Sequence, residues 1–210
     1  MNNRILYVDA LKAVSMLAVI ISHVFIRFEN GNCMLSFITA WDLPIFFMAS
    51  GFFTKNISQL RFKTLCIKKS ITLLFPYISF VFISSFFRGL DTLSVYFMND
   101  GKGGLWFLPV LFVMFLLLYM ISKISNTNSN YGNILSIIGG VLIAVIMLVL
   151  YLTMPTSWIG PSSILSFVVY WPYFFIGHVF AKINKYELMF VNERVASICA
   201  LAFFAWWGGV

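Results

Sequence analysis

Lys12 and His23 are the two residues near the start of the chain whose types and spacing could do chemistry. They stand eleven positions apart, and eleven steps of ~100° return a helix to within about 20° of its starting direction. The two side chains would therefore share one helical face, roughly 16 Å apart along the axis. A histidine is a good general base for a hydroxyl proton. Asp9, three residues before Lys12, could pair with the lysine on the same face.

At least one member of this pair must lie at membrane depth. A helix that started after Lys12 would have only the segment Ala13–Phe28, about 16 residues interrupted by His23 and Arg27. A crossing helix needs ~20 mainly apolar residues, and a lysine at its centre costs roughly 2.5–3.5 kcal/mol on insertion scales. Two interpretations stand: a functional pair inside the membrane, or two side chains that extend to the inner and outer headgroups.

The composition predicts an integral membrane protein. Hydrophobic residues make up 61% of the 210 residues and charged residues 10%, whereas roughly a quarter of a soluble chain is charged. The first apolar run is long and others follow it, so it is a retained span rather than a cleaved signal. We expect an all-α, polytopic transmembrane helix bundle that forms one domain over residues 1–210. The expected spans lie near Ile5–Ile26, Met34–Thr54, Thr64–Phe87, Gly104–Ser122, Ile134–Met154 and Ser162–Lys182, with a partial seventh from Val195.

The basic residues predict the orientation, because short cytoplasmic loops carry an excess of Lys and Arg. The net charge is +7. The N-terminal tail and alternate loops hold Arg4, Lys55, Arg61, Lys63, Lys68, Lys69, Lys123, Lys182, Lys185 and Arg194. The opposite loops hold Arg27, Arg88 and Lys102. This asymmetry predicts a cytoplasmic N-terminus in a multi-pass protein of the cell (cytoplasmic) membrane, and it explains the positive charge without nucleic-acid binding. The cysteines are widely spaced, so no metal site is expected.

Five short sequence strings occur in order along the chain, and the first of them lies in the first span. The opening string VDALKAVSMLAVIISH contains Lys12 and His23. In order along positions 5–182 follow LPIFFMASGFF, LLFPY, LWFLPVLFVMFLLLY and YFFIGHVFAK. Together they resemble the acyltransferase 3 family, whose signature is a basic residue, ten further residues and a histidine in the first span. Lys12 stands where the family commonly has arginine.

The resemblance implies a membrane-bound O-acyltransferase that moves groups other than aminoacyl groups. The donor substrate would be cytosolic acyl-CoA, with acetyl-CoA expected, and no bound cofactor is implied. The acceptor would be a hydroxyl of a cell-surface polysaccharide or of its lipid-linked precursor. His23 would act as the base, and Lys12 would contribute to donor binding or helix positioning.

The family often has a second basic motif, Arg-x-x-Arg, shortly before the LLxPY string. Here Lys69 stands at its first position and Thr72 at its second, so one charge is lost. Lys68 could substitute, because phosphates accept lysine as a point charge. Lys68 and Lys69 are therefore candidate donor-binding residues. The alternative is that they, with Lys63, only anchor the inner side of the membrane.

Other polar and aromatic residues have weaker assignments. Asp42 stands just before LPIFF and could face the acceptor or cap the start of the second span. Trp106 could line the substrate cavity, or serve as an interface anchor like Trp41, Trp158 and Trp171. His178 is expected to be structural, and Ser50-Gly51 to permit close helix packing.

Two rival functions remain. Family members usually have about ten spans, so we expect this chain to be shortened at its C-terminus, and an inactive fragment is one alternative. The other is a non-enzymatic component of a polysaccharide exporter, which predicts charged residues within several spans. Apart from Lys12 and His23 few such residues occur. A downstream reading frame with four more hydrophobic segments would favour the enzyme.

The charge asymmetry predicts that position 63 faces the cytoplasm and position 101 faces outward. Single cysteines at these positions, in a background without the three native cysteines, test it. An impermeant thiol reagent should label position 101 in intact cells. Exclusive labelling at position 63 would reverse the orientation.

Overall fold

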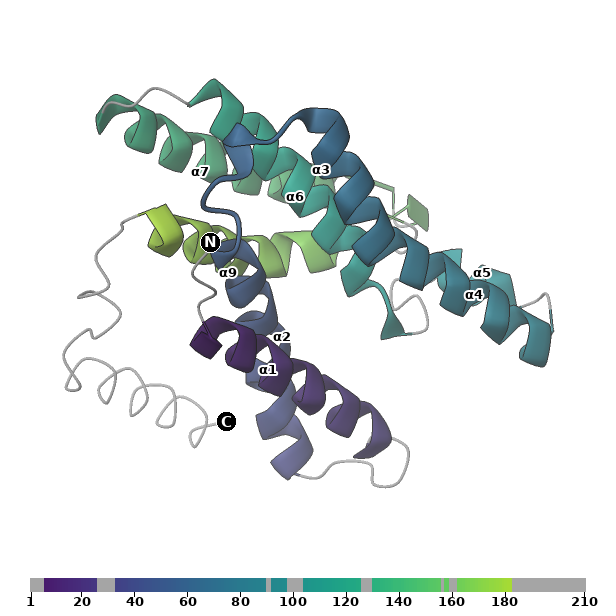
Figure 1. Ribbon diagram of the computed structural model, residues 1–210. Helices are drawn as coiled ribbons and strands as arrows, with labels where there is room; N and C mark the ends of the chain where they lie inside the picture. Colours follow the sequence, from purple (N-terminus) through teal and green to yellow (C-terminus); the bar gives the residue numbers. More distant parts are fainter. Residues whose placement is uncertain are drawn as a thin grey trace.

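The computed structural model describes residues 6–25, 33–89, 92–97, 104–125, 130–155, 157–158 and 162–182, and their regular secondary structure is helical (Figure 1). The first long helices are α1 (Leu6–Phe25) and α2 (Cys33–Phe52). After them come α3 (Phe62–Lys69), the π-helical turn η2 (Ser70–Leu74), α4 (Phe75–Arg88) and the short α5 (Thr92–Phe97). The chain continues with α6 (Phe107–Ile124), α7 (Asn130–Thr153) and α9 (Ile164–Lys182).

Each of the six expected spans corresponds to a helix, with ends that differ by a few residues. Within the described residues, 4 helices are long and apolar enough to cross a membrane: Phe62–Arg88, Phe107–Ile124, Ile134–Thr153 and Ile164–Lys182. The all-helical, polytopic class is therefore confirmed. The number of spans and the cytoplasmic N-terminus stay predictions, and the seventh run lies outside the described residues. The helix α5 was not predicted.

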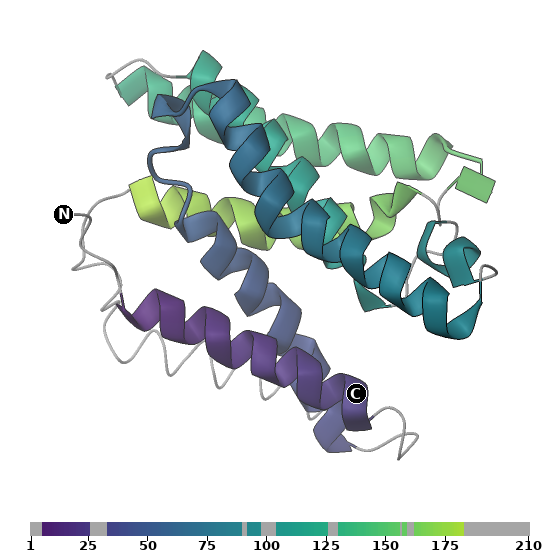
Figure 2. The ribbon, with the colours of Figure 1, turned by 45° about the vertical axis from the view of Figure 1, so that its right-hand side comes forward.

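A widened turn joins α3 to α4 in one continuous helix (Figure 2). In η2 the Phe75 N–H bonds to the Ser70 carbonyl, a spacing of five residues instead of four. Pro76 follows at the start of α4 and has no N–H to give to the preceding turn. The π turn accommodates the backbone hydrogen bond that Pro76 cannot donate. Its extra residue changes the helical register between Lys69 and α4.

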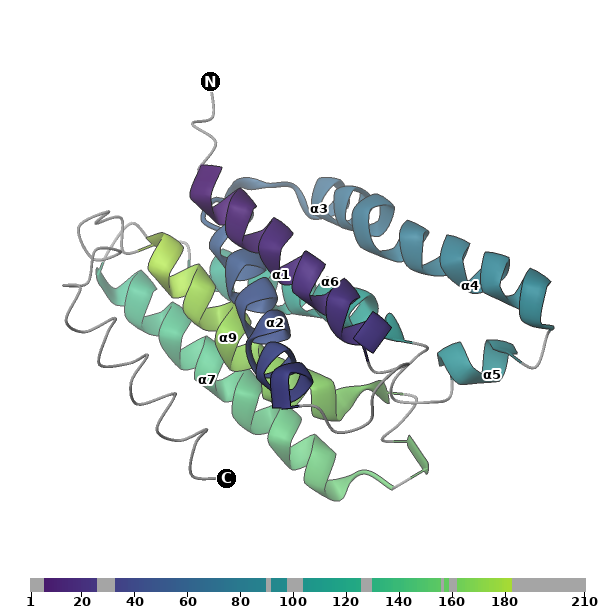
Figure 3. The same ribbon diagram turned by 90° about the horizontal axis from the view of Figure 1, so that it is seen from below.

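The closest helix contact joins α2 to α9, which lies between α2 and α7 (Figure 3). A Cβ atom at Gly51 would collide with the Phe174 carbonyl oxygen and lie 2.8 Å from its carbon. A Cβ atom at Gly177 would collide in the same way with the Met48 carbonyl. The expected role of Ser50-Gly51 in close packing is thus confirmed at Gly51, because each glycine lets the other helix's backbone approach.

Aromatic side chains of α2, α6 and α9 fill the interior around this contact. Phe47, Met114 and Phe174 are fully buried. Trp171 is also buried, and its Nε1 donates a hydrogen bond to the Gly140 carbonyl of α7 at 3.0 Å. The interpretation of Trp171 as an interface anchor is therefore wrong, because the Gly140 carbonyl gives the indole an acceptor inside the protein. The outer side of α7 is apolar and exposed, as a lipid-facing helix requires.

Gly51→Ala should destabilise the fold by more than the about 1–3 kcal/mol typical of overpacking, because its Cβ meets rigid backbone. Gly139→Ala is the matched control, since its Cβ would meet side-chain atoms of Ile121, 2.9 Å away, rather than backbone. Thermal unfolding in detergent, followed by size-exclusion chromatography, measures both variants. Equal melting temperatures for the two would contradict the role of the α2–α9 contact.

Candidate functional site

One face of α1 points into the protein, and Lys12 lies on it. Val19, at nearly the same helical angle, is buried, and Met16 packs against the core. Val14 and Leu17, on other faces, are more than half exposed. The backbone of α1 places His23 in line with Lys12 and Val19, four residues beyond Val19. The side chains of His23 and Asp9 lie outside the described part of the structure, so the Asp9–Lys12 pairing stays a prediction.

The Lys12 ammonium lies against two aromatic rings at and just beyond the C-terminal half of α2. Its Nζ is 5.3 Å from the centroid of Phe46 and 6.0 Å from that of Phe53. Aromatic faces attract a cation, by ~0.5–1 kcal/mol at exposed sites and more when water is excluded. Ser15, buried one turn further along, donates its hydroxyl to the Lys12 carbonyl at 2.9 Å. The lysine is therefore directed toward α2 and the interior.

Lys69 lies within electrostatic range of Lys12, whereas Lys68 is exposed. The Nζ of Lys69 lies 3.5 Å above the centroid of the Phe115 ring of α6. The positive charge of Lys12 acts on Lys69 across this part of the interior. Lys68 is exposed, because successive residues of a helix point ~100° apart. The structure thus brings together two of the three candidate donor-binding lysines.

A second cluster gathers Asp42, Trp106 and a residue that the sequence did not single out, Tyr170. The Phe47 ring stacks on the Tyr170 ring at 4.9 Å and on the Trp106 ring at 6.2 Å, centroid to centroid. The ring centroids of Trp106 and Tyr170 lie 5.2 Å apart. The Asp42 carboxylate is buried and lies within electrostatic range of the Tyr170 hydroxyl. Tyr170 belongs to an aromatic-rich string, VVYWPYFF, in which no spacing marks it.

Asp42 does not cap the start of a helix. The helix α2 begins at Cys33, so Asp42 lies in its middle, and that interpretation is wrong. Asp42 Oδ1 instead accepts the Leu43 N–H at 2.6 Å. Pro44 follows inside the helix and has no N–H, which disturbs the regular backbone bonds at this point. A carboxylate is consequently held between membrane helices, where such groups are costly and commonly functional.

His178 of α9 is hydrogen-bonded to Thr54, just after the end of α2. Its Nδ1 lies 2.7 Å from Thr54 Oγ1, and the Thr54 hydroxyl donates to the Gly51 carbonyl. Since the threonine proton is used there, Nδ1 must carry the hydrogen of the His178–Thr54 bond. The imidazole is fully buried, and Nε2 has no partner among the described residues. This geometry agrees with the structural role expected for His178.

A family model for an acyltransferase domain, Acyl_transf_3, matches residues 5–210. No curated protein and no solved structure matches the chain. The match extends over both clusters, the paired lysines on one side and the Asp42–Trp106–Tyr170 group on the other.

Proposed function

The chain belongs to the acyltransferase 3 family, and we propose that it moves an acyl group, acetyl in the first instance, from cytosolic acyl-CoA to a hydroxyl of a cell-surface polysaccharide or of its lipid-linked precursor. The observation that carries this proposal is that Lys12 and Lys69 each lie over a phenylalanine ring of the interior and within electrostatic range of each other. Two like charges held together inside a membrane protein favour an anionic ligand, which removes their repulsion.

The donor would bind at the paired lysines. Coenzyme A carries phosphate groups, and a lysine ammonium binds phosphate as a point charge. In the predicted orientation both lysines lie toward the cytoplasmic ends of their helices, where acyl-CoA is available. Phosphates held there would leave the thioester arm free to reach toward the centre of the bundle. Positioning of donor and acceptor would supply much of the rate.

His23 would act at the other end of the α1 face. As general base it would take the proton of the acceptor hydroxyl while that oxygen attacks the thioester carbonyl carbon. An ester bond forms, the carbon–sulfur bond breaks, and the coenzyme A thiolate leaves. The proton held on His23 is returned to this thiolate. The helical register of α1, with Lys12 and His23 roughly 16 Å apart on one face, supports this division of roles.

The acceptor would bind at the cluster of Asp42, Trp106 and Tyr170. Flat aromatic rings can stack against the apolar face of a sugar, and a carboxylate can accept hydrogen bonds from its hydroxyl groups. In the predicted orientation Trp106 lies at the outward end of α6, immediately before Phe107. The two proposed substrate sites adjoin at α2, where Phe46 lies against Lys12 and the next residue, Phe47, stacks on Tyr170 and Trp106.

Lys69→Gln should raise the Michaelis constant for acyl-CoA about tenfold or more, because a charge-assisted contact with phosphate is lost. Lys68→Gln is the matched control, since the same change on the exposed neighbour should leave the constant within about twofold. Initial rates against acyl-CoA concentration in membranes, at equal protein level, measure both. If Lys68→Gln had the larger effect, the assignment of the donor site would be wrong.

His23→Gln should abolish detectable transfer, because glutamine keeps a hydrogen-bonding side chain but cannot serve as a base. General-base assistance is worth ~10²–10⁴-fold in rate. Mass spectrometry of surface glycans measures the ester in cells with the wild-type gene, the variant gene or no gene. Protein level and membrane insertion should stay near normal. A His23→Gln protein that still acylates would remove the proposed base from the mechanism.

A further inference from the structure

Four aromatic rings, two from α2 and two from the start of α6, contact one another in a closed circuit. Phe46 meets Phe47 edge to face, with 6.0 Å between ring centroids, and meets Phe107 in the same way at 5.6 Å. Trp106 lies edge to face against Phe107 at 6.4 Å and stacks on Phe47 at 6.2 Å. The three phenylalanines are buried. We call these rings the four-ring layer.

The proposed donor lysines lie on one side of this layer. The Lys12 ammonium lies against Phe46 and Phe53, and Phe53 stands seven residues, roughly 10 Å, further along the chain. Lys69 lies over Phe115, which is eight residues, roughly 12 Å, further along α6 than the layer. In the predicted orientation α2 and α6 both run inward. The two ammonium groups therefore lie on the cytoplasmic side of the layer.

The proposed acceptor cluster adjoins the layer on its outward side. Asp42 is four residues, about one helical turn, outward of Phe46 on α2. Tyr170 stacks on Phe47 at 4.9 Å, and its ring centroid lies 5.2 Å from that of Trp106. Phe47 and Trp106 thus belong to the layer and to the acceptor cluster. Phe46 is the layer residue that contacts a donor lysine.

A sugar in the acceptor site would disturb the layer. Phe47 covers one face of the Trp106 ring and one face of the Tyr170 ring. A sugar that took either face would displace Phe47, and Phe46 is the preceding residue of the same helical turn. Pro44 stands two residues before Phe46 and gives no N–H to the backbone hydrogen bonds of α2. Helices bend at such residues, so this turn can transmit the displacement to Phe46.

The thioester of acyl-CoA has two competing acceptors. In transfer a sugar oxygen bonds to the acyl carbon, and in hydrolysis a water oxygen does. In both reactions the carbon–sulfur bond breaks and coenzyme A leaves as its thiol, but hydrolysis gives a free acid instead of an ester. Water is far more abundant than the acceptor. Enzymes avoid this side reaction when they exclude water, or when the correct substrate assembles the site.

We propose that Phe46 is a specificity-determining residue that favours transfer over hydrolysis. Its ring keeps the thioester on the donor side while the acceptor site is empty, and it moves aside when a sugar displaces Phe47. The inference rests on the proposed function and adds an order of events to it. The acceptor binds first, and the thioester then passes the layer.

Two products of radiolabelled acetyl-CoA measure this specificity: ester in glycan and free acetate. Both are counted in membrane vesicles that contain the endogenous acceptor, after subtraction of the counts from vesicles without the gene. Phe46→Ala should raise the ratio of acetate to ester about tenfold or more, because the thioester can pass an open layer without a sugar. Phe46→Leu, which keeps most of the apolar volume, should raise it less, by about threefold.

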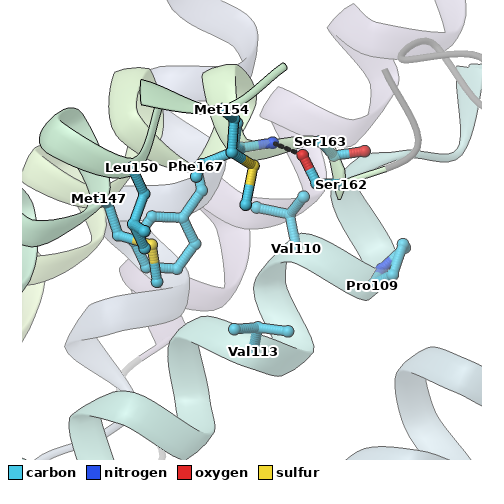
Figure 4. Close-up of a pocket in the computed structure, with 10 residues that line it drawn as sticks. Pro109, Val110, Val113, Met147, Leu150, Met154, Ser162, Ser163 and Phe167 are labelled. Carbon is cyan, nitrogen blue, oxygen red and sulfur yellow. Dashed lines mark hydrogen bonds between the residues drawn. The ribbon is translucent and has the colours of Figure 1, made fainter. Parts of the chain in front are cut away.

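Phe167→Ala is the matched control, because Phe46 and Phe167 are each 4% exposed and the same buried ring is lost. Phe167 stands outside the layer. It stacks on Trp171 at 5.2 Å and lines an apolar pocket between α6, α7 and α9 (Figure 4). Its ratio of acetate to ester should stay within about twofold of wild type, whereas a general loss of packing would change both variants alike.

Cysteine labelling tests the layer without requiring acyl transfer. Asp42→Cys, in a background without the three native cysteines, puts a thiol on the outward side of Phe46. An impermeant anionic methanethiosulfonate is added to inside-out vesicles, which expose the cytoplasmic face. Adding Phe46→Ala should speed the labelling about tenfold or more, because the buried ring no longer blocks the way. Adding Phe167→Ala should leave the rate within about twofold.

Equal labelling rates with and without Phe46→Ala, or an unchanged ratio of acetate to ester in both Phe46 variants, would overturn the proposal. Faster labelling with Phe46→Ala in a protein that transfers no acyl group would contradict the proposed function, while the four-ring layer would stand as a barrier.

Discussion

The backbone contact between α2 and α9 is the constraint on which the other positions depend. Gly51 lies against the Phe174 carbonyl and Gly177 against the Met48 carbonyl, so neither helix can shift without collision. Helices in a membrane gain no hydrophobic stabilisation from each other, and close approach of this kind supplies packing in its place. The His178–Thr54 hydrogen bond fixes the same contact just beyond the C-terminal end of α2. Asp42 and Tyr170 are brought together because they lie on these two helices.

Helical register then determines which lysines point into the protein and which are exposed. α1 packs chiefly against α2, and its inward face sets Lys12 over Phe46. The continuous helix of α3 and α4 packs its π turn against α6, which directs Lys69 over Phe115 and leaves Lys68 exposed. No local sequence motif determines the position of the Lys12 or the Lys69 ammonium group. Each is positioned by a helix whose other faces are apolar, and their convergence follows from how these helices pack on α2 and α6.

The sequence was sufficient for the helices and for part of the site. Spans could be located because a crossing helix needs a long apolar run, and the shared face of Lys12 and His23 follows from arithmetic on the helical repeat. The choice between Lys68 and Lys69 could not be made, because the register change at η2 depends on Pro76 and on packing against α6. Tyr170 and Trp171 are neighbours in an aromatic string, and only tertiary contacts separate a site residue from a core residue. Asp42 could either face the acceptor or cap a helix start, and the structure excludes the cap because α2 begins at Cys33.

The central claim is that acyl-CoA reaches the paired lysines from the cytoplasmic side and that its acyl group passes to an acceptor that enters from the other side of the membrane. Sealed vesicles of both orientations, given radiolabelled acetyl-CoA in the outer solution only, test it directly. Inside-out vesicles, which expose the cytoplasmic face, should incorporate label into glycan ester, and right-side-out vesicles should not until they are permeabilised. Equal incorporation in both intact orientations, or incorporation by right-side-out vesicles alone, would contradict the account.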